Sequence, residues 1–365
     1  MSFIHKPSLY KPEHVVSESE MLAEIKKKYC NDPSLQKILK MVKNCGILKR
    51  HIIRPLNDSL AHKKFTDKST LYQQQLVTIA EVVVSKALET AHLQPVDIDL
   101  IIDVSCSGFM MPSMSSYLIN RMGFRHDVKK MPVAQLGCSA GASALLKAHD
   151  YIQAYPFHNV LIVAIELNSL CYQPTDHDVE AAICSALFGD GGAACVVNQS
   201  QGKHGLHILD NMTYTLPNSE HYIKYDVKDT GFHFRLDKEV MHSVEHLLSG
   251  VEGVFKKYIP ELSMLDFIFS HTGGKSIMDA IINYTSVDEK RIKHSRASFR
   301  ELGNVSSVSV LDVIRRGLTD FSAKKEHSQS NDVPIGAIFG IGPDVTIDAL
   351  VAYWGTHSSL HLGHD

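Results

Sequence analysis

Short apolar runs rich in β-branched residues alternate with amphipathic segments along most of this chain. Ile98–Ser105 (IDLIIDVS) and Asn159–Ile165 (NVLIVAI) are typical of buried strands. Apolar residues recur at spacings of three and four in 71–92 and 139–154, which predicts helices before and between these strands. The chain repeats this alternation after residue 237. The pattern predicts a layered α/β fold whose two halves are similar in kind.

Length and charge narrow the classes of function. The 365 residues exceed a typical domain of about 100–200 residues. No run approaches the roughly 18 apolar residues of a membrane span, and residues 1–10 resemble neither a secretory signal nor an anchor. The formal charge of -3 gives no general attraction to nucleic acid or anionic lipid. We therefore expect a cytoplasmic protein that binds neither nucleic acid nor membranes.

The cysteines are odd in number and show neither a CxxC pair nor zinc-finger spacing. We expect free thiols and no metal site, and most of the thiols should be small buried apolar groups. The seven are Cys30, Cys45, Cys106, Cys138, Cys171, Cys184 and Cys195.

One cysteine lies in a context that can activate a thiol. Cys138 follows a predicted strand and Gly137, and it precedes the helix expected at 139–154. At a helix N-terminus, unpaired N–H groups stabilise a thiolate and can lower the pKa from about 8.5 to roughly 3.5–7.5. The local sequence leaves two interpretations open, a nucleophile and a buried structural cysteine.

A histidine and an asparagine later in the chain could complete an acyl-transfer site. His271 ends a predicted strand and precedes a glycine pair, so its imidazole should face a loop-lined site. Asn304 follows a glycine at a helix start, where it could also be a simple N-cap. Together with Cys138 these side chains suit attack by a thiol and stabilisation of a carbonyl oxyanion by two neutral donors.

Several motifs together resemble the type III polyketide synthases, chalcone-synthase-like members of the thiolase superfamily. They are Gly137-Cys138, Ala186-Leu-Phe-Gly-Asp-Gly191, His271-x-Gly-Gly274, Gly303-Asn304 and Gly340-Ile-Gly-Pro343. Within the family, the runs at 106–112, 169–174 and 219–234 look closest to the phloroglucinol-forming bacterial members. The resemblance implies a thiolase-like αβαβα fold with a cysteine-bearing half at 1–220 and a half bearing the histidine and asparagine at 221–365.

The resemblance also implies the reaction. Cys138 would take an acyl group from coenzyme A as a thioester, while His271 and Asn304 would hydrogen-bond the malonyl thioester carbonyl during loss of carbon dioxide. The resulting enolate would attack the Cys138 thioester in a Claisen condensation. Malonyl-CoA, with an acyl-CoA starter as an alternative, would be the substrate, and no metal, flavin or nicotinamide cofactor is expected.

Further positions follow from the same resemblance. Met111, before Pro112, would line the neighbouring subunit's pocket in a homodimer, and Asn168 and Cys171 would line the cavity. Residues 13–55 look helical and basic, so their cations would hold the coenzyme A phosphates. The residues assigned to coenzyme A binding are Lys40, Lys43, Lys49, Arg50, Gly273 and Gly274.

Two departures from the family bear on the product. Asp344 replaces the last glycine of a Gly-Phe-Gly-Pro-Gly loop, where it either caps the next strand or faces the cavity. Alignment back from Pro217 puts the phenylalanine gatekeeper of plant members at Leu206, which would widen the gate for an aliphatic chain.

The favoured product is phloroglucinol, made from three malonyl units. An acyl-CoA-primed alkylpyrone or alkylresorcinol synthase shares the same Cys138, His271 and Asn304, and so does a ketoacyl synthase of the fatty-acid type. A non-catalytic thiolase-fold partner subunit would have no chemical reason to keep all three.

Overall fold

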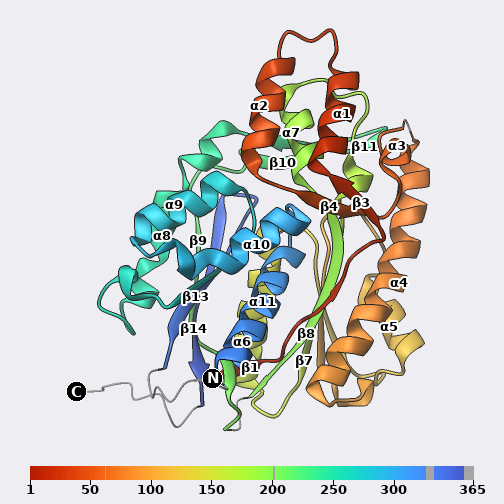
Figure 1. Cartoon of the computed structure of the whole chain (residues 1–365). Coiled ribbons are helices and arrows are strands. Elements are labelled where there is room, and N and C mark those ends of the chain that lie inside the picture. The colour runs from red at the N-terminus through yellow and green to blue at the C-terminus, as the bar shows by residue number, and fades with distance from the viewer. Residues whose placement is uncertain (62, 200–201, 326–332, 357–365) are drawn as a thin grey trace.

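A ten-stranded mixed sheet runs through the whole molecule (Figure 1). The computed structural model describes residues 1–61, 63–199, 202–325 and 333–356. The sheet has the order β12-β13-β14-β9-β1-β8-β7-β5-β6, with β2 also paired to β8. Its strands are β1 (Ser2–Ile4), β2 (Ser8–Tyr10), β5 (Leu100–Val104), β6 (Lys129–Val133), β7 (Val160–Leu167), β8 (Asp190–Gln199), β9 (Gly205–Thr215), β12 (Phe267–Ser270), β13 (Ile335–Gly342) and β14 (Thr346–Gly355).

The sheet has two arms of similar build, joined by the short strand β1. In one arm β6, β5 and β7 are parallel and β8 is antiparallel to them. In the other arm β12 and β13 are parallel, while β14 and β9 are antiparallel. The predicted boundary at residue 220 assigned β9 to the first half, whereas β9 pairs with β14 of the second arm.

Helices cover both faces of each arm. They are α1 (Glu18–Lys28), α2 (Leu35–Cys45), α3 (Leu56–Ser59), α4 (Phe65–Ala91), α5 (Met114–Met122), α6 (Ala140–Ala154), α7 (Val179–Leu187), α8 (Val244–Phe255), α9 (Lys275–Thr285), α10 (Lys293–Leu302) and α11 (Val308–Lys325). Figure 1 shows α4 and α5 outside one arm, α8 and α9 outside the other, and α6 with α11 between them. The predicted layered α/β fold is confirmed.

The alternation of side chains along a strand explains why one arm of the sheet has an apolar core on each of its two faces. Successive side chains of a strand point to opposite faces, so Ile102 packs toward α6 and α11 while its neighbour Ile101 packs toward α4. Both isoleucines are fully buried. The continuous apolar run of β5 therefore follows from helices on both faces of the strand.

The longest described helix, α4, is held by a one-sided apolar stripe. Leu76, Ile79, Ala80 and Val83 recur at spacings of three and four and are all buried against the sheet. The helix ends at His92, which adopts a left-handed conformation. Within the described ranges, no helix combines the length and hydropathy that crossing a membrane requires.

A smaller lobe lies above the sheet in Figure 1 and contains α1, α2 and α7. Two two-stranded ladders belong to it, β3 (His14–Ser17) with β4 (Lys49–Ile52), and β10 (Ile223–Lys228) with β11 (Gly231–Leu236). The expectation that residues 13–55 are helical is thus wrong at both ends of that segment. There β3 and β4 pair with each other in an antiparallel ladder.

The first turn of α6 packs so closely on the start of α11 that only glycine fits at position 141. A Cβ at Gly141 would overlap the Ser307 carbonyl oxygen and lie 2.7 Å from Val310 Cγ1.

We expect Gly141→Ala to lower the free energy of unfolding by about 1–3 kcal/mol, as overpacking does. The matched control is Gly253→Ala in α8, where a Cβ meets nothing within 4 Å. Urea denaturation should show Gly253→Ala neutral or stabilising by up to about 1 kcal/mol; equal stability of both variants would contradict the close contact.

Candidate active site

Cys138 sits in a tight turn between the sheet and the central helix α6. The turn is a short 3-10 helix, Gly137–Ser139, which leads directly into α6. Gly137 has a φ of 49°, and a Cβ there would lie 2.7 Å from Pro343 Cδ. A glycine is therefore needed for the turn to approach the loop after β13. The predicted placement of Cys138 at the first turn of a helix is confirmed.

Asn304 faces the Cys138 sulfur with its amide nitrogen. Its Nδ2 lies 3.8 Å from Cys138 Sγ. Its Oδ1 accepts a hydrogen bond of 2.8 Å from the backbone N–H of Ser306, which fixes the orientation of the amide. The backbone of Asn304 is also tied to the segment around Phe188, since its N–H donates to Leu187 O at 2.9 Å. The side chain thus satisfies a local turn and still presents a donor toward the thiol.

His271 lies at the end of a strand in the other arm of the sheet. It follows β12, and its N–H donates to Phe339 O at 2.8 Å. The adjacent Thr272 donates through Oγ1 to Gly303 O at 3.2 Å, next to Asn304. A Cβ at Gly273 would lie 2.6 Å from His271 Cε1, so glycine at 273 leaves room for the imidazole. Cys138 and Asn304 therefore meet where the two central helices begin, and the segment that carries His271 is tied to the residue before Asn304 through Thr272.

Burial controls the protonation states of this group. Burial raises the pKa of Cys138 to about 11, although hydrogen bonds from Ser306 and Asn304 lower it in part. The expectation that the helix N-terminus lowers this pKa is wrong, because desolvation outweighs it. Burial lowers the pKa of His271 to about 4. At neutral pH the Cys138 thiol and the His271 imidazole are therefore both uncharged.

A buried carboxylate behind the nucleophile was missed from the sequence. Glu166 is the penultimate residue of β7, is fully buried, and accepts a hydrogen bond of 2.6 Å from Ser307 Oγ. Its other oxygen accepts from the N–H groups of Cys106 at 3.1 Å and Ser107 at 3.2 Å. Burial raises its pKa. The sequence signal that could have indicated this residue is a carboxylate near the end of an otherwise apolar strand.

Ser306 contacts two thiols, and it too was not predicted from the sequence. It adopts a left-handed φ of 47°, which is uncommon for a residue with a side chain. Its Oγ lies 3.5 Å from Cys106 Sγ and also hydrogen-bonds the Cys138 thiol. The strained backbone is maintained by the surrounding hydrogen bonds, as is common at active sites.

A narrow cavity lies beside the loop that follows β7. Its lining is mixed, with thiols and polar groups beside aromatic rings: Asn168, Cys171, Tyr172, Gln173, Asp176, Ala181, Cys184, Ser185, Phe188, Tyr225 and Phe234. Asn168 and Cys171 thus line a cavity, and their predicted role in holding the substrate stays a prediction. Asn168 Nδ2 donates to Gly189 O at 2.7 Å, and the Cys171 thiol donates to Ser107 O at 3.3 Å. Burial raises the pKa of Cys171 to about 12.

Leu206 does not belong to this cavity. It is fully buried in β9, where it pairs with Ile4 and packs in the central core. The aromatic pair at the cavity is instead Phe188 and Phe234, whose ring centroids are 5.2 Å apart in an edge-to-face arrangement. Both phenylalanines lie in runs that the sequence analysis singled out, but the alignment back from Pro217 pointed to the wrong strand.

Asp344 and Met111 both lie at the surface. Asp344 is exposed in the β13–β14 turn with a left-handed φ of 58°, and it is not one of the residues that line the cavity. Aspartate tolerates this conformation better than most residues, which explains how it can replace glycine there. Met111 is 81% exposed and forms a cis peptide bond with Pro112.

The predicted coenzyme A cations divide into two groups. Lys40, Lys43 and Lys49 are exposed, whereas Arg50 is only 1% exposed. Burial lowers the pKa of Arg50, and its Nε and Nη1 have no hydrogen-bond partner within the described ranges. Arg50 is therefore not the surface cation that the sequence predicted. Gly274, by contrast, precedes α9, and a Cβ there would meet nothing within 4 Å.

The layered fold with two sheet arms of similar build is thiolase-like. The N-terminal domain of chalcone and stilbene synthases matches residues 9–201, and the C-terminal domain of that family matches residues 207–354. The chain therefore belongs to the chalcone and stilbene synthases, the acyltransferases known as type III polyketide synthases. The predicted family is confirmed.

Two relatives and one solved structure illustrate the likeness. A 1,3,6,8-tetrahydroxynaphthalene synthase of Streptomyces coelicolor is 40% identical over 98% of this chain and 93% of its own. A phloroglucinol synthase of Pseudomonas fluorescens is 36% identical over 97% of this chain and 99% of its own. The crystal structure of 1,3,6,8-tetrahydroxynaphthalene synthase from Streptomyces coelicolor superposes with a TM-score of 0.90 at 39% identity, covering 96% of this chain and 99% of that one.

The protonation states predict how Cys138 reacts with iodoacetamide. Because burial raises the pKa of Cys138 to about 11, the thiolate fraction should rise through neutral and mildly alkaline pH. Alkylation should accelerate by about tenfold per pH unit between pH 7 and 10, since the thiolate is the nucleophile. Peptide mass spectrometry would follow Cys138, with the exposed Cys30 labelled in the same digest as a measure of reagent. A plateau near pH 7 would instead indicate a resting thiolate–imidazolium pair.

Proposed function

We propose that this enzyme condenses malonyl-CoA with itself and cyclises the chain to a small polyhydroxylated aromatic product. The observation that carries the proposal is the likeness to two synthases of polyhydroxylated aromatic products, a 1,3,6,8-tetrahydroxynaphthalene synthase at 40% identity and a phloroglucinol synthase at 36% identity. Each is matched over at least 97% of this chain. The acyl-CoA-primed alternative is therefore less well supported.

The chemistry uses the neutral site in two stages. Transfer of an acyl group to Cys138 Sγ forms a thioester and releases coenzyme A, with His271 accepting the thiol proton. Malonyl-CoA then loses carbon dioxide, and the electron pair of the broken C–C bond enters the enolate, whose oxygen Asn304 Nδ2 and His271 stabilise. The enolate carbon attacks the Cys138 thioester, a C–C bond forms, and the C–S bond to Cys138 breaks.

Substrate binding and assembly extend this proposal. The exposed ammonium groups of Lys40, Lys43 and Lys49 are free to meet the phosphates of coenzyme A, and no cofactor beyond the thioester is invoked. Met111 and Phe109 are 81% and 63% exposed on one loop. Exposed apolar residues of this size favour burial against a partner, here a second copy of the chain.

Two products are candidates. Phloroglucinol contains six carbons, the number that three malonyl units supply, and the runs at 169–174 and 219–234 favour it. 1,3,6,8-Tetrahydroxynaphthalene contains ten carbons, which requires five units. The 40% identity to a synthase of that name supports this second candidate.

Mass spectrometry of products separates these candidates. Purified enzyme given malonyl-CoA alone should yield an aromatic polyol, and addition of a long-chain acyl-CoA should not raise the total turnover. Phloroglucinol or tetrahydroxynaphthalene would identify the number of units directly. Products that form only with the acyl-CoA would overturn the malonyl-only proposal, and product from Cys138→Ala would overturn the nucleophile.

The oxyanion role of Asn304 can be measured without cyclisation. We expect Asn304→Ala to slow conversion of malonyl-CoA to acetyl-CoA by on the order of 100-fold or more, because one oxyanion donor typically contributes about 2.7–4 kcal/mol. Asn120→Ala is a matched control, since Asn120 is exposed and donates only to Ser116 O of its own helix. Decarboxylation that is equally fast in both variants would place the oxyanion site elsewhere.

A further inference from the structure

One wall of the cavity is a hairpin that is not part of the central sheet. Strands β10 and β11 pair with each other and, within the described ranges, with no other strand. Tyr225 and Phe234 are opposite each other in this ladder and both line the cavity. The Tyr225 phenol interacts with the Cys171 thiol on the opposing loop. The position of the wall therefore depends on side-chain contacts between the hairpin and that loop.

Gln173 forms the central contact. Its Nε2 donates to two hairpin carbonyls, Phe232 O at 2.8 Å and Thr230 O at 3.3 Å. Its Oε1 accepts from Lys68 Nζ at 3.4 Å, and the same ammonium donates to Tyr172 O at 2.9 Å. One carboxamide thus connects α4, the loop after β7 and the turn of the hairpin.

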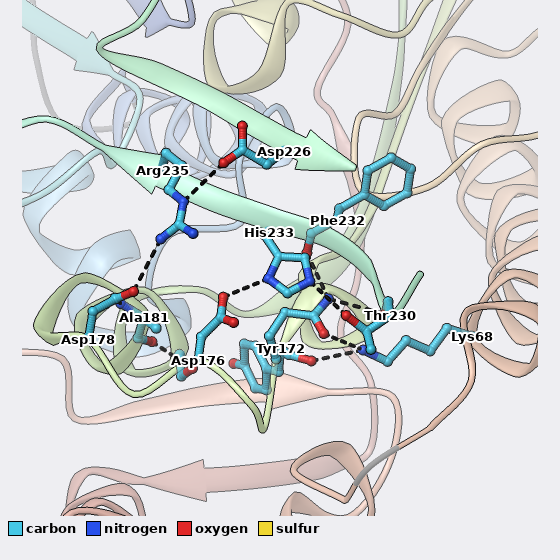
Figure 2. A network of polar contacts seen from close by, with 12 residues as sticks. Lys68, Tyr172, Asp176, Asp178, Ala181, Asp226, Thr230, Phe232, His233 and Arg235 are labelled. Atoms are coloured by element: carbon cyan, nitrogen blue, oxygen red, sulfur yellow. Dashed lines mark hydrogen bonds and ion pairs between the residues drawn. The ribbon is translucent and has the colours of Figure 1, made fainter. Parts of the chain in front are cut away.

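His233 forms a second contact from the hairpin to the same loop. Figure 2 shows its ring pointing at Asp176, and the Nδ1–Oδ2 distance is 2.7 Å. The other ring nitrogen lies 2.7 Å from Thr230 Oγ1, so both nitrogens have partners. At the exposed edge, Arg235 bridges Asp226 and Asp178.

The two inner contacts are the ones shielded from water. Gln173 is 7% exposed, Lys68 8% and His233 1%. Buried polar groups that lose their partners are costly, so these contacts allow one arrangement of hairpin and loop and disfavour sliding. An apolar hairpin face without them could shift along the loop with little change in burial.

We propose that Gln173 and His233 are positioning residues that determine how many malonyl units are added before cyclisation. They fix the positions of Tyr225 and Phe234 relative to Cys171. They thereby determine the space available to the growing polyketide and the conformation that it can adopt. Neither residue touches the reacting atoms. This inference rests on the proposed iterative use of malonyl-CoA.

Product analysis of matched variants tests it. Gln173→Leu removes all three side-chain contacts, whereas Gln173→Glu can still accept from Lys68 but cannot donate to the hairpin carbonyls. His233→Leu removes the second contact, and His233→Gln retains one donor for Asp176. The control is Lys224→Ala, which breaks only an exposed ion pair with Asp226 at 3.1 Å on the same hairpin.

The expected result separates an effect on the length of the product from an effect on the rate of decarboxylation. In Gln173→Leu, Gln173→Glu and His233→Leu, the ratio of full-length product to early-released pyrones should fall by on the order of tenfold, because small misplacements near a reacting chain have large effects. Conversion of malonyl-CoA to acetyl-CoA should stay within about twofold of the unaltered enzyme, since His271 and Asn304 are untouched. Alkylation of Cys171 should accelerate in the same variants, and His233→Gln and Lys224→Ala should resemble the unaltered enzyme.

Three outcomes would overturn the proposal. They are an unchanged product ratio in folded Gln173→Leu and Gln173→Glu, a parallel loss of decarboxylation and product, and equal effects in Lys224→Ala. Thermal unfolding identifies a variant that fails to fold. If Gln173→Leu does not fold, the product ratios of Gln173→Glu and His233→Leu decide whether the proposal holds. If the unaltered enzyme makes nothing from malonyl-CoA, the proposed function fails by itself, and unchanged Cys171 alkylation would then separately refute the positioning role.

Discussion

The close contact between the starts of α6 and α11 is the constraint on which the site depends. Cys138 begins one of these central helices, and Asn304 to Ser307 precede the other. Gly141 allows the backbone of α6 to reach the Ser307 carbonyl, and this brings the thiol within 3.8 Å of the Asn304 amide. Each half of the chain supplies one member of the pair, so the nucleophile meets its partner only when both halves are packed together.

The same packing determines the electrostatics. A helix N-terminus favours a thiolate, but here burial of the partly exposed thiol raises its pKa. The imidazole of His271 is buried as well, and its pKa falls. Both effects favour the uncharged forms, so the resting site separates no charge. Neutral donors suit an enolate that develops only during decarboxylation, because they need not be released from an existing ion pair.

Features set by local sequence could be predicted, while features set by tertiary contacts could not. The strand of Asn159–Ile165 and the turn at Cys138 follow from local composition, and the structure confirms them. Arg50 was misplaced because residues 13–55 were expected to be helical. In strand β4 only Lys49 is exposed, whereas Arg50, His51 and Ile52 are all buried by the elements packed around the strand. Leu206 was misplaced because sequence distance from a distant proline does not show which strand lines a cavity.

Chemistry and specificity depend on different kinds of interaction in this fold. Cys138, His271 and Asn304 are carried by the central helices and the sheet, where backbone ladders and a continuous apolar core resist displacement. The hairpin with Tyr225 and Phe234 has its own ladder but depends on side chains such as Gln173 for its place beside the cavity. By this argument a substitution in such a contact moves the wall of the cavity and leaves the packing around Cys138 in place. Under the proposed function, product length then depends on contacts outside the condensing site, while the chemistry of condensation stays the same.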